Sequence, residues 1–529
     1  MKSINFKNFR RFTDFPDFKF GDITILVGGN NAGKSTVVKA LLLILDNIKT
    51  MRRDPDNVFQ IQPDFRFDKN QYHDLSIGSF AQALNRNAND DKRIEFSLKV
   101  EEIEFGFEID EDAEAEGGSM SGKVNKIIVT NTSKGIKFII DFYTEGRGQS
   151  MQFIYKDPSY NDIANQLTTL KQRQKVLSAK LSDADDNDIY EFPDLKHELS
   201  VVKSNINKLT KLEKEKSEGL TVLMPIRDHI YRTHDTIIVD LLEDFLMFSK
   251  ETSNLYEGEW PSWATPFKDA AKALNLMSHE IHNCIIRIQE VLSLMDVTYI
   301  QAHGVSQRTL YKIGDTSDFA ASTLTDFVSS RAYKNKPIRE FIRKWMRWFN
   351  IGYDFKIETA LDEAFTVSIL ENENDSKGFP MAHLGMGSIQ LMVLLFGLAT
   401  QMKNYDGMVF NYPTVIIEEP EQNLHPALQS KLADLFSELT RRYSFRFIIE
   451  THSEYLVRRS QVLMADPTQA IWYHEGIEEV EDMEHPFKVY YFPNNGNPYD
   501  MKYREDGCFS EEFGSGFFDE ASNLAFKLF

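Results

Sequence analysis

A glycine-rich turn near the N-terminus ends in a lysine and a serine, an order that suits phosphate binding. Residues 28–35 read Gly-Gly-Asn-Asn-Ala-Gly-Lys-Ser, which fits the pattern G-x-x-x-x-G-K-[ST]. Glycines let backbone N–H groups approach phosphate oxygens, while Lys34 would contribute a charge and Ser35 a hydroxyl for Mg²⁺. The alternative is a chance glycine-rich turn. The predicted phosphate cradle consists of Gly28, Asn30, Asn31, Ala32, Gly33, Lys34, Ser35 and Thr36.

Two carboxylates follow an apolar run much later in the chain. Residues 414–417 read Thr-Val-Ile-Ile and lead into Glu418, Glu419 and Pro420. Neighbouring side chains of a strand point to opposite faces, so the two carboxylates can take different roles. We expect Glu418 to reach Mg²⁺ through water and Glu419 to polarise the water that attacks the γ-phosphate. The alternative is a solvated strand end without chemistry.

A histidine follows the next apolar run. Residues 445–449 read Phe-Arg-Phe-Ile-Ile and lead through Glu450 and Thr451 to His452. A histidine just past a strand and beside a phosphate loop can contact the γ-phosphate or orient the attacking water. A lone histidine is more often structural, so this role depends on the fold bringing the two segments together.

These segments need strands and helices that position them. The apolar run 23–27 predicts a buried strand before the glycine-rich turn, and the residues after it predict a helix over 34–48. Strand and helix patterns return after Gly352 and alternate to about residue 465. The sequence therefore predicts an α/β fold whose nucleotide-binding core is split between the two ends of the chain. The expected domains are an N-terminal lobe with the phosphate cradle (1–160), a helical hairpin (161–217), a mostly helical insertion (218–350) and a C-terminal lobe (351–529).

The hairpin is predicted from two seams of apolar residues spaced alternately four and three apart, which favours a short antiparallel coiled coil. The alternative is two ordinary amphipathic helices packed on the body of the protein. Residues 182–188 have the composition of a turn between the two arms. The seams consist of Ile163, Leu167, Leu170, Leu177 and Leu181, and of Leu195, Leu199, Val202, Ile206 and Leu209.

The composition excludes several classes of protein. Sixty basic and eighty acidic side chains in 529 residues give a net charge of −20, so contact with nucleic acid would require a local basic patch or a partner. Two cysteines exclude a disulfide framework or a cysteine-rich metal site. The apolar runs are too short to span a bilayer and no secretory signal is read, so a cytoplasmic protein is expected.

Two clusters supply candidate basic patches for nucleic acid, one within 171–216 and one within 339–347. The alternative for both is a solvated or core-covering helix face.

Together the motifs resemble those of the ABC-type ATPases of the SMC, RecF and overcoming-lysogenization-defect (OLD) group. The strings Glu-Glu-Pro-Glu at 418–421 and Glu-Thr-His-Ser at 450–453 are similar to the OLD-like branch, although Glu418 replaces the usual aspartate. The resemblance implies an ABC-type P-loop ATPase core, ATP and Mg²⁺ as cofactors, and catalytic roles for Glu419 and His452. It also implies a signature segment, for which Gly385, Gly387 and Ser388 are the candidates, and a Q-loop glutamine near the metal, for which Gln82 is the candidate. Because the signature binds the ATP of the opposite subunit, a homodimer or higher oligomer is expected.

The segment after His452 lacks a further motif of many OLD-type proteins. Those proteins continue into a Toprim nuclease, whose chemistry needs an Asp-x-Asp pair, and none occurs in the 77 residues that follow His452 (529 − 452). The split core, short hairpin and lack of Toprim resemble the PtuA family of Septu anti-phage systems, also found beside some retrons. That resemblance implies a separately encoded HNH-type nuclease partner (PtuB-like), with retron RNA or DNA as possible nucleic-acid ligands. The alternative is an SMC/RecF-like repair ATPase that clamps DNA directly.

Overall fold

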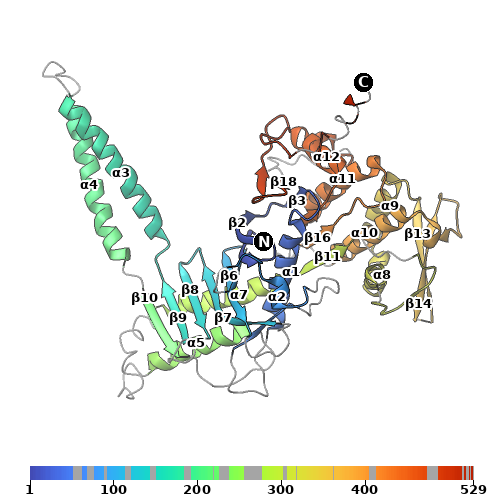
Figure 1. Cartoon of the computed structure of the whole chain (residues 1–529), viewed down its shortest axis with the longest axis horizontal. Helices are drawn as coiled ribbons and strands as arrows, with labels where there is room; N and C mark the ends of the chain where they lie inside the picture. Colours follow the sequence, from blue (N-terminus) through green and yellow to red (C-terminus); the bar gives the residue numbers. More distant parts are fainter. Residues whose placement is uncertain are drawn as a thin grey trace. The chain divides into compact units, whose positions relative to one another are not determined.

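The structure is a computed structural model of the chain (Figure 1), and it divides the polypeptide into two compact units. Unit 1 contains Met1, residues 3–14 and residues 41–293, and unit 2 contains Lys2, residues 15–40 and residues 294–529. The structure describes residues 1–51, 62–67, 77–88, 92–112, 121–142, 150–183, 192–217, 220–225, 237–254, 274, 277–301, 307–316, 318–361, 363–403, 413–472, 486–514, 517–519, 524 and 526–527.

Unit 2 is built on a six-stranded sheet in which residues from both ends of the chain lie side by side. Strand β3 is fully buried, which fits its unbroken apolar sequence, because a parallel strand covered on both faces needs no polar alternation. The first five strands are parallel, and the last is antiparallel to its neighbour. In sheet order they are β11 (Val297–Gln301), β16 (Thr414–Glu418), β17 (Arg446–Glu450), β3 (Ile23–Gly28), β18 (Phe487–Phe492) and β19 (Tyr499–Met501).

Helices and a smaller antiparallel sheet complete unit 2. Helix α10 has almost no polar face, and its interior residues belong to one core cluster with strands β3, β16 and β17. The helices are α1 (Lys34–Thr50, which continues into unit 1), α8 (Phe319–Ser329), α9 (Lys336–Trp348), α10 (Met386–Lys403), α11 (Pro426–Tyr443) and α12 (Glu454–Ala465). The smaller sheet contains β12 (Tyr311–Lys312), β13 (Asp354–Ala360), β14 (Ala364–Leu370) and β15 (Phe379–Pro380).

Unit 1 contains a nine-stranded, largely antiparallel sheet. Its strands alternate buried and partly exposed residues, as expected for a sheet with one face on the core. Helices α5 (Ile237–Asn254) and α7 (Ser278–Ser293) and the short α2 (Phe80–Ala83) belong to the same unit. The strands are β1 (Ser3–Phe9), β2 (Phe12–Lys19, which ends in unit 2), β4 (Asp64–Arg66), β5 (Ile94–Val100), β6 (Ile103–Glu111), β7 (Ser121–Asn131), β8 (Ile136–Asp141), β9 (Ser150–Tyr155) and β10 (Leu220–Pro225).

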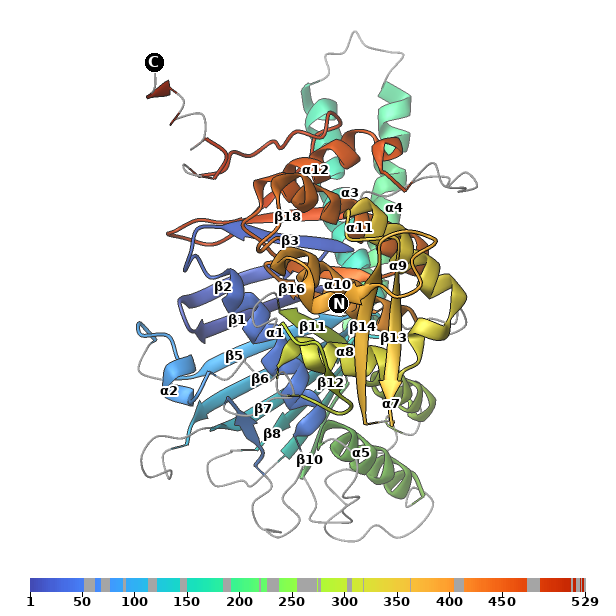
Figure 2. The same ribbon diagram turned by 90° about the vertical axis from the view of Figure 1, so that its right-hand side faces the viewer.

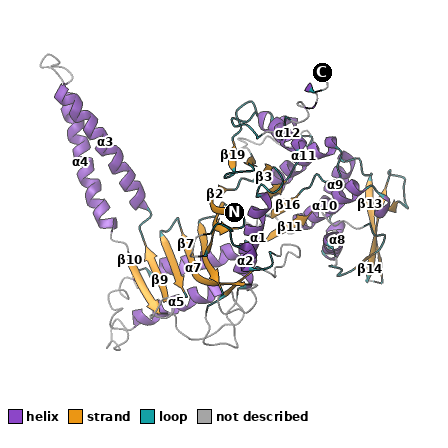
Figure 3. Ribbon diagram, viewed as in Figure 1, coloured by secondary structure: helices purple, strands orange, loops and turns teal. Residues whose placement is uncertain are grey.

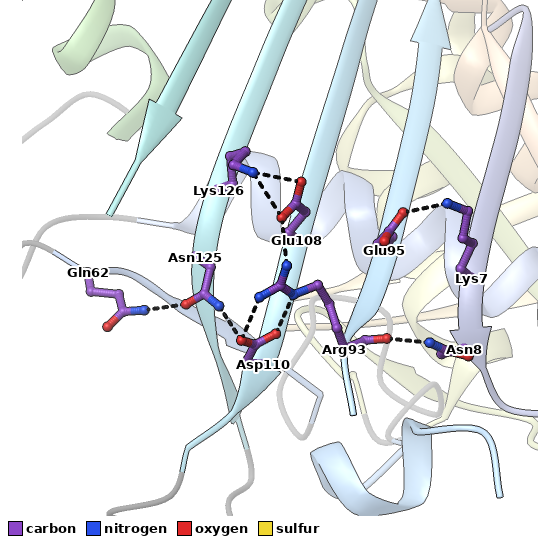
Figure 4. A network of polar contacts seen from close by, with 9 residues as sticks. All are labelled: Lys7, Asn8, Gln62, Arg93, Glu95, Glu108, Asp110, Asn125 and Lys126. Atoms are coloured by element: carbon purple, nitrogen blue, oxygen red, sulfur yellow. Dashed lines mark hydrogen bonds and ion pairs between the residues drawn. The ribbon is translucent and has the colours of Figure 1, made fainter. Parts of the chain in front are cut away.

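A polar network crosses three strands of this sheet (Figure 4). The Arg93 guanidinium donates to both carboxylate oxygens of Asp110, at 2.7 and 3.0 Å, and to Glu108 at 3.1 Å. Lys126 donates to Glu108, and Asn125 donates to Asp110, next to the register shift between β6 and β7. Each charge in the network faces an opposite charge across the ladder, so these residues stabilise the strand pairing.

The two predicted arms are helices that pack against each other (Figures 1 and 2). They are α3 (Ser159–Asp183) and α4 (Phe192–Ser217), both drawn as long helices in Figure 3. Leu177, Leu199 and Val202 form a small buried cluster, with Leu170 and Ile206 packed on it, so the predicted seams face each other. Arg173 pairs with Glu198 beside the seam. The predicted turn lies partly outside the described residues.

Two further expectations from the sequence can be compared with the structure. The segment 218–350, expected to be mostly helical, also supplies the strands β10, β11 and β12, and β11 belongs to the main sheet of unit 2. A run of five residues such as Val297–Gln301 is too short for periodicity to separate strand from helix. Among the described residues, no helix combines the length and the apolar character that crossing a membrane would require.

Candidate functional site

The candidate site lies where three neighbouring parallel strands of unit 2 end. The register places Glu450 of β17 beside Glu418 of β16 on one side and beside Leu26 of β3 on the other. Strand β3 then runs directly into the glycine-rich turn at Gly28. Because parallel strands end at the same edge of a sheet, the fold gathers the turn and both carboxylates at one place.

The glycine-rich turn has the backbone that its sequence predicts. Gly28, Asn31 and Gly33 have positive φ angles of 145°, 61° and 104°. A Cβ atom on Gly28 would lie 2.3 Å from the carbonyl oxygen of Phe492 in β18, so only glycine fits there. Helix α1 begins at Lys34, which places the positive end of its dipole behind the turn. This is a cradle for an anion.

Lys34 lies folded back into this cradle. Its Nζ donates to the carbonyl oxygens of Gly28 at 3.1 Å and of Gly29 at 3.0 Å, and only 3% of the residue is exposed. Burial lowers the pKa of Lys34, and the nearby carboxylates of Glu450, Glu419 and Glu421 oppose that effect. The ammonium group is therefore held in the site by backbone carbonyls and by negative charge.

Ser35 is held by a glutamate from the switch segment, the string Glu-Thr-His-Ser at 450–453. Its hydroxyl donates to Oε1 of Glu450 at 2.8 Å. Glu450 is 5% exposed, and burial together with the charges of Glu418 and Glu419 raises its pKa to about 7, against the opposing effects of Ser35 and Lys34. The sequence analysis quoted Glu450 but gave it no role. The signal that it missed was a carboxylate at the end of an otherwise apolar strand.

Glu419 lies in the left-handed region of the backbone, with a φ of 46°. Such a conformation is unfavourable for a glutamate and persists where the surroundings hold it. Here its N–H donates to the carbonyl oxygen of Glu450 at 2.7 Å, and its carboxylate accepts from Nε2 of Gln422 at 3.4 Å. The turn directs the Glu419 side chain toward the switch histidine.

The imidazole of His452 lies beside that carboxylate. Its Nε2 is 3.8 Å from Oε1 of Glu419, and its side chain is 35% exposed. Burial, together with the charge of Lys34, lowers the pKa of His452, and Glu419 opposes the shift. A neutral imidazole next to a carboxylate can accept or pass on a proton at neutral pH.

A second buried carboxylate fixes the loop that carries His452. Oε1 of Glu421 accepts the backbone N–H of His452 at 2.6 Å, and burial raises the pKa of Glu421. One residue further on, the hydroxyl of Ser453 caps α12 by accepting from the N–H of Leu456 and donates to Gln429. Lys34, Ser35, Glu419 and His452, which the sequence placed together by their motifs, therefore lie at one sheet edge.

Comparison with known families agrees with this arrangement. The sequence of residues 1–457 matches the family described as AAA ATPase domain. The chain belongs to this family of ATPase domains. A comparison with curated proteins found no match. Among solved structures, the SMC head domain from Thermotoga maritima is similar, with 9% identity over 87% of this chain and 91% of that chain and a TM-score of 0.28.

The ATPase family implies a nucleotide and usually Mg²⁺, and the side chains present fit both. The glycine-rich cradle and Lys34 suit a triphosphate. Oxygen donors suit Mg²⁺. Ser35 Oγ and Oε2 of Glu450, which is buried and has no hydrogen-bond partner among the described residues, lie at the start of α1 beside the cradle. Among the described residues no cluster of three or more acidic, histidine or cysteine side chains could hold a metal ion.

Glu418 of this ATPase domain lies between Glu450 of β17 and a residue of β11. The sheet register pairs it with Gln301 at the end of β11, and its charge adds to the burial that raises the pKa of Tyr299. The Tyr299 hydroxyl accepts from Nε2 of Gln301 at 3.0 Å. Tyr299 and Gln301 are not among the site residues predicted from the sequence, because the segment 218–350 is expected to be mostly helical. The expected role of Glu418 at Mg²⁺ stays a prediction.

The proposed signature segment lies at the start of α10. A Cβ atom on Gly387 would come within 2.4 Å of the carbonyl oxygen of Asn423, and Nδ2 of Asn423 donates to Gln390 at 3.1 Å. The segment therefore packs on the loop that follows Glu419. Gly385 is exposed and has open space around its Cα, and Ser388 is partly exposed. Binding of these residues to the ATP of a second copy stays a prediction.

Gln82 lies in the other compact unit. It belongs to α2 of unit 1, where its backbone N–H donates to Ser79 at 3.3 Å as part of the helix cap. Its assignment as the Q-loop residue stays a prediction.

The basic cluster of α9 is engaged within unit 2. Arg339 and Arg343 pair with Asp354, at 3.0 and 3.4 Å. The guanidinium groups of Arg343 and Arg347 both lie over the ring of Tyr353. These side chains pack the helix on β13, so the alternative of a core-covering face fits this cluster better than a nucleic-acid patch.

Proposed function

We propose that this protein is the ATP-binding and ATP-hydrolysing regulatory subunit of an anti-phage defence complex. Two copies would close around ATP and control a separately encoded nuclease. The observation that carries the ATPase part is the meeting of Lys34, Ser35, Glu419 and His452 at one edge of the unit 2 sheet. Membership of an ATPase domain family supports it.

Each residue of the site has a chemical role in this proposal. Residues Gly28, Asn30, Asn31, Ala32 and Gly33 enclose the phosphates with backbone N–H groups, and Lys34 neutralises the β- and γ-phosphates. Mg²⁺, when bound, spreads the charge that develops on the transferred phosphoryl group. Glu419 orients the attacking water and polarises it, while the neutral imidazole of His452 donates or accepts a hydrogen bond at the γ-phosphate.

Dimer formation is proposed from the place of the signature segment. Within one chain, residues 385–388 pack on the loop after Glu419, and no described contact joins them to the phosphate cradle. A second copy brought head to tail would offer the start of α10, with its exposed Gly385 and partly exposed Ser388, to the nucleotide. Binding of ATP then favours the closed pair, and hydrolysis removes the contacts that held it closed.

The nuclease partner is proposed from the architecture. The split core and the short helical hairpin resemble those of the PtuA family, whose ATPase holds an HNH-type nuclease. The test is to co-express the chain with an HNH-type (PtuB-like) nuclease, purify the complex, and assay DNA cleavage with and without ATP. Cleavage that responds to ATP in the wild type, and not with Lys34→Ala, supports regulation. A nuclease that neither co-purifies nor changes its activity would refute it.

The ATPase assignment has its own test. Lys34→Ala should abolish ATP binding, whereas Glu419→Gln should keep it, slow turnover by a factor of about 100 or more and trap the closed dimer. Lys19→Ala is the matched control for the lysine change, because Lys19 is an exposed residue at the end of β2. Wild-type turnover by the glutamine variant would remove Glu419 from catalysis.

A second candidate, an SMC/RecF-like clamp on DNA, is favoured by the charge of the hairpin. In sequence, the two helices α3 and α4 carry ten basic and six acidic side chains, and one of the acidic ones, Glu198, pairs with Arg173. Binding of DNA that requires ATP and weakens steeply with salt, by the chain alone, would support this candidate. The basic side chains are Lys171, Arg173, Lys175, Lys180, Lys196, Lys203, Lys208, Lys211, Lys214 and Lys216.

A further inference from the structure

The carboxylate that is hydrogen-bonded to Ser35, the proposed metal ligand, comes from β17 and not from the acidic pair at the end of β16. Ser35 Oγ donates to Oε1 of Glu450 at 2.8 Å. Oε2 of the same carboxylate is buried and has no hydrogen-bond partner among the described residues. The two residues are 415 positions apart in the chain, so only the strand order brings them together.

This hydrogen bond decides where the Ser35 oxygen can point. A serine hydroxyl has one proton and two lone pairs. When Ser35 donates its hydroxyl proton to Glu450, the lone pairs of the Ser35 oxygen point away from that carboxylate and are available to a cation. An unrestrained hydroxyl would rotate among its rotamers and would lose conformational freedom each time it bound a metal ion.

Glu450 also holds the neighbouring catalytic segment, through a different atom. Its backbone carbonyl oxygen accepts the N–H of Glu419 at 2.7 Å. One residue thus fixes Ser35 with its side chain and the strained turn of Glu419 with its main chain. A side-chain substitution removes the first contact and leaves the second in place, which makes the two separable by mutation.

Glu418 is placed differently. Its register neighbour on the outer side is Gln301, and its charge acts on Tyr299 of β11. No described hydrogen bond joins Glu418 to Ser35, and the strand that carries Glu450 lies between β16 and β3. In the ABC pattern, the carboxylate at the position of Glu418 lies near the metal. Here Glu418 is one strand further from Ser35 than Glu450 is.

We propose that Glu450 is the positioning residue for Mg²⁺ in this ATPase, because it holds the Ser35 hydroxyl with its oxygen lone pairs toward the metal. The inference rests on the proposed ATP and Mg²⁺ site and assigns the metal side of that site to Glu450 rather than to Glu418. It concerns binding of the Mg²⁺–nucleotide complex and involves no proton transfer.

The test measures binding, not turnover. The full chain is titrated with a non-hydrolysable ATP analogue by calorimetry, once with excess Mg²⁺ and once with EDTA, and the ratio of the two Kd values is the Mg²⁺ response. Glu450→Met keeps the side-chain length and removes the acceptor, so it should lower the Mg²⁺ response by about tenfold, as loss of a hydrogen bond to a charged group predicts. The Kd in EDTA should stay within about twofold.

Four further variants make the assignment specific. Ser35→Ala removes the hydroxyl itself, so it should lower the Mg²⁺ response at least as much as Glu450→Met does. The double variant should lose no more than Ser35→Ala, because Glu450 acts through that hydroxyl. Ser35→Ala also keeps the test independent of how well the methionine variant folds. Glu450→Gln should keep most of the response, since its amide oxygen can accept the same hydrogen bond. Glu418→Gln should have the smaller effect.

The outcomes separate this inference from the proposed function. A wild-type Mg²⁺ response in Glu450→Met, or additive losses in the double variant, would overturn the role of Glu450 while the ATP site stands. A larger loss of the Mg²⁺ response in Glu418→Gln than in Glu450→Met would show that Glu418, and not Glu450, acts on the metal. Failure of the wild-type chain to bind the analogue at all would instead remove the proposed function.

Discussion

Replacing Glu450 with glutamine should change how the stability of the protein depends on pH. The carboxyl group is buried, and its pKa is raised from the ordinary value of 4.5 to about 7 in the folded chain. A raised carboxyl pKa means that the folded state holds the proton more tightly than the unfolded state does. The stability that this group contributes is therefore fully present below about pH 4.5 and is lost as the pH rises through about 7.

The size of the effect follows from the shift. The difference between 7 and 4.5 is 2.5, and each unit corresponds to about 1.4 kcal/mol, so the full change is about 3 kcal/mol. Glutamine resembles the protonated carboxyl in shape and can still accept from Ser35. The variant should match the wild type near pH 4.5 and exceed its free energy of unfolding by about 3 kcal/mol above pH 7.

The assay is urea unfolding in EDTA, without nucleotide, at a series of pH values from about 4.5 to about 8.5. Glu373→Gln, which removes the same charge from an exposed loop of unit 2, is the matched control and should show no such trend. A difference between Glu450→Gln and the wild type that is constant with pH would refute the reasoning. So would a difference that shrinks as the pH rises, because the sign would then be wrong.

Three other predictions concern the same site. The pKa of His452 is below its ordinary value of 6.5, so the stability that its neutral form contributes is present above pH 6.5 and lost as the pH falls through the lower folded pKa. NMR titration of the wild type and His452→Gln should identify this ring by its low midpoint, and a midpoint above 6.5 would contradict the prediction. Gly28→Ala should lower the free energy of unfolding by about 1–3 kcal/mol and abolish ATP binding, because the new Cβ would lie 2.3 Å from the carbonyl oxygen of Phe492. Thermal unfolding measures the loss of stability. Glu421→Gln should keep the hydrogen bond from the backbone N–H of His452 and near-normal ATP turnover, whereas Glu421→Ala should reduce turnover. Equal turnover rates for the two variants would show that this hydrogen bond does not position the histidine.

Local sequence was sufficient for the parts of the site that are carried by short motifs. The cradle at 28–35, the acidic pair at 418–419 and His452 each follow an apolar strand, and the resemblance to ABC-type ATPases implied that they meet. Glu450 was quoted without a role, because its closeness to Ser35 depends on β17 lying between β16 and β3. Sheet order is a property of the whole fold, and no window of sequence contains it.

The same limit applies to β11 and to the arginines of α9. Residues 297–301 form a strand because β16 offers a parallel edge, which outweighs the helical character of their surroundings. The arginines have helical spacing and aromatic neighbours, which suits a nucleic-acid surface equally well. Their engagement with Asp354 and Tyr353 came from the way β13 packs on the helix.

The position of β3 in the sheet has a consequence for synthesis on the ribosome. This strand is made among the first residues, yet both of its neighbours, β17 and β18, lie near the other end of the polypeptide. At about 5–20 residues per second, translation of the 415 positions that separate Ser35 from Glu450 takes on the order of tens of seconds. During that time the nascent chain carries an apolar strand with both edges unpaired, which is a target for chaperones and a risk for aggregation. Nucleotide can stabilise this site only after β17 has been made.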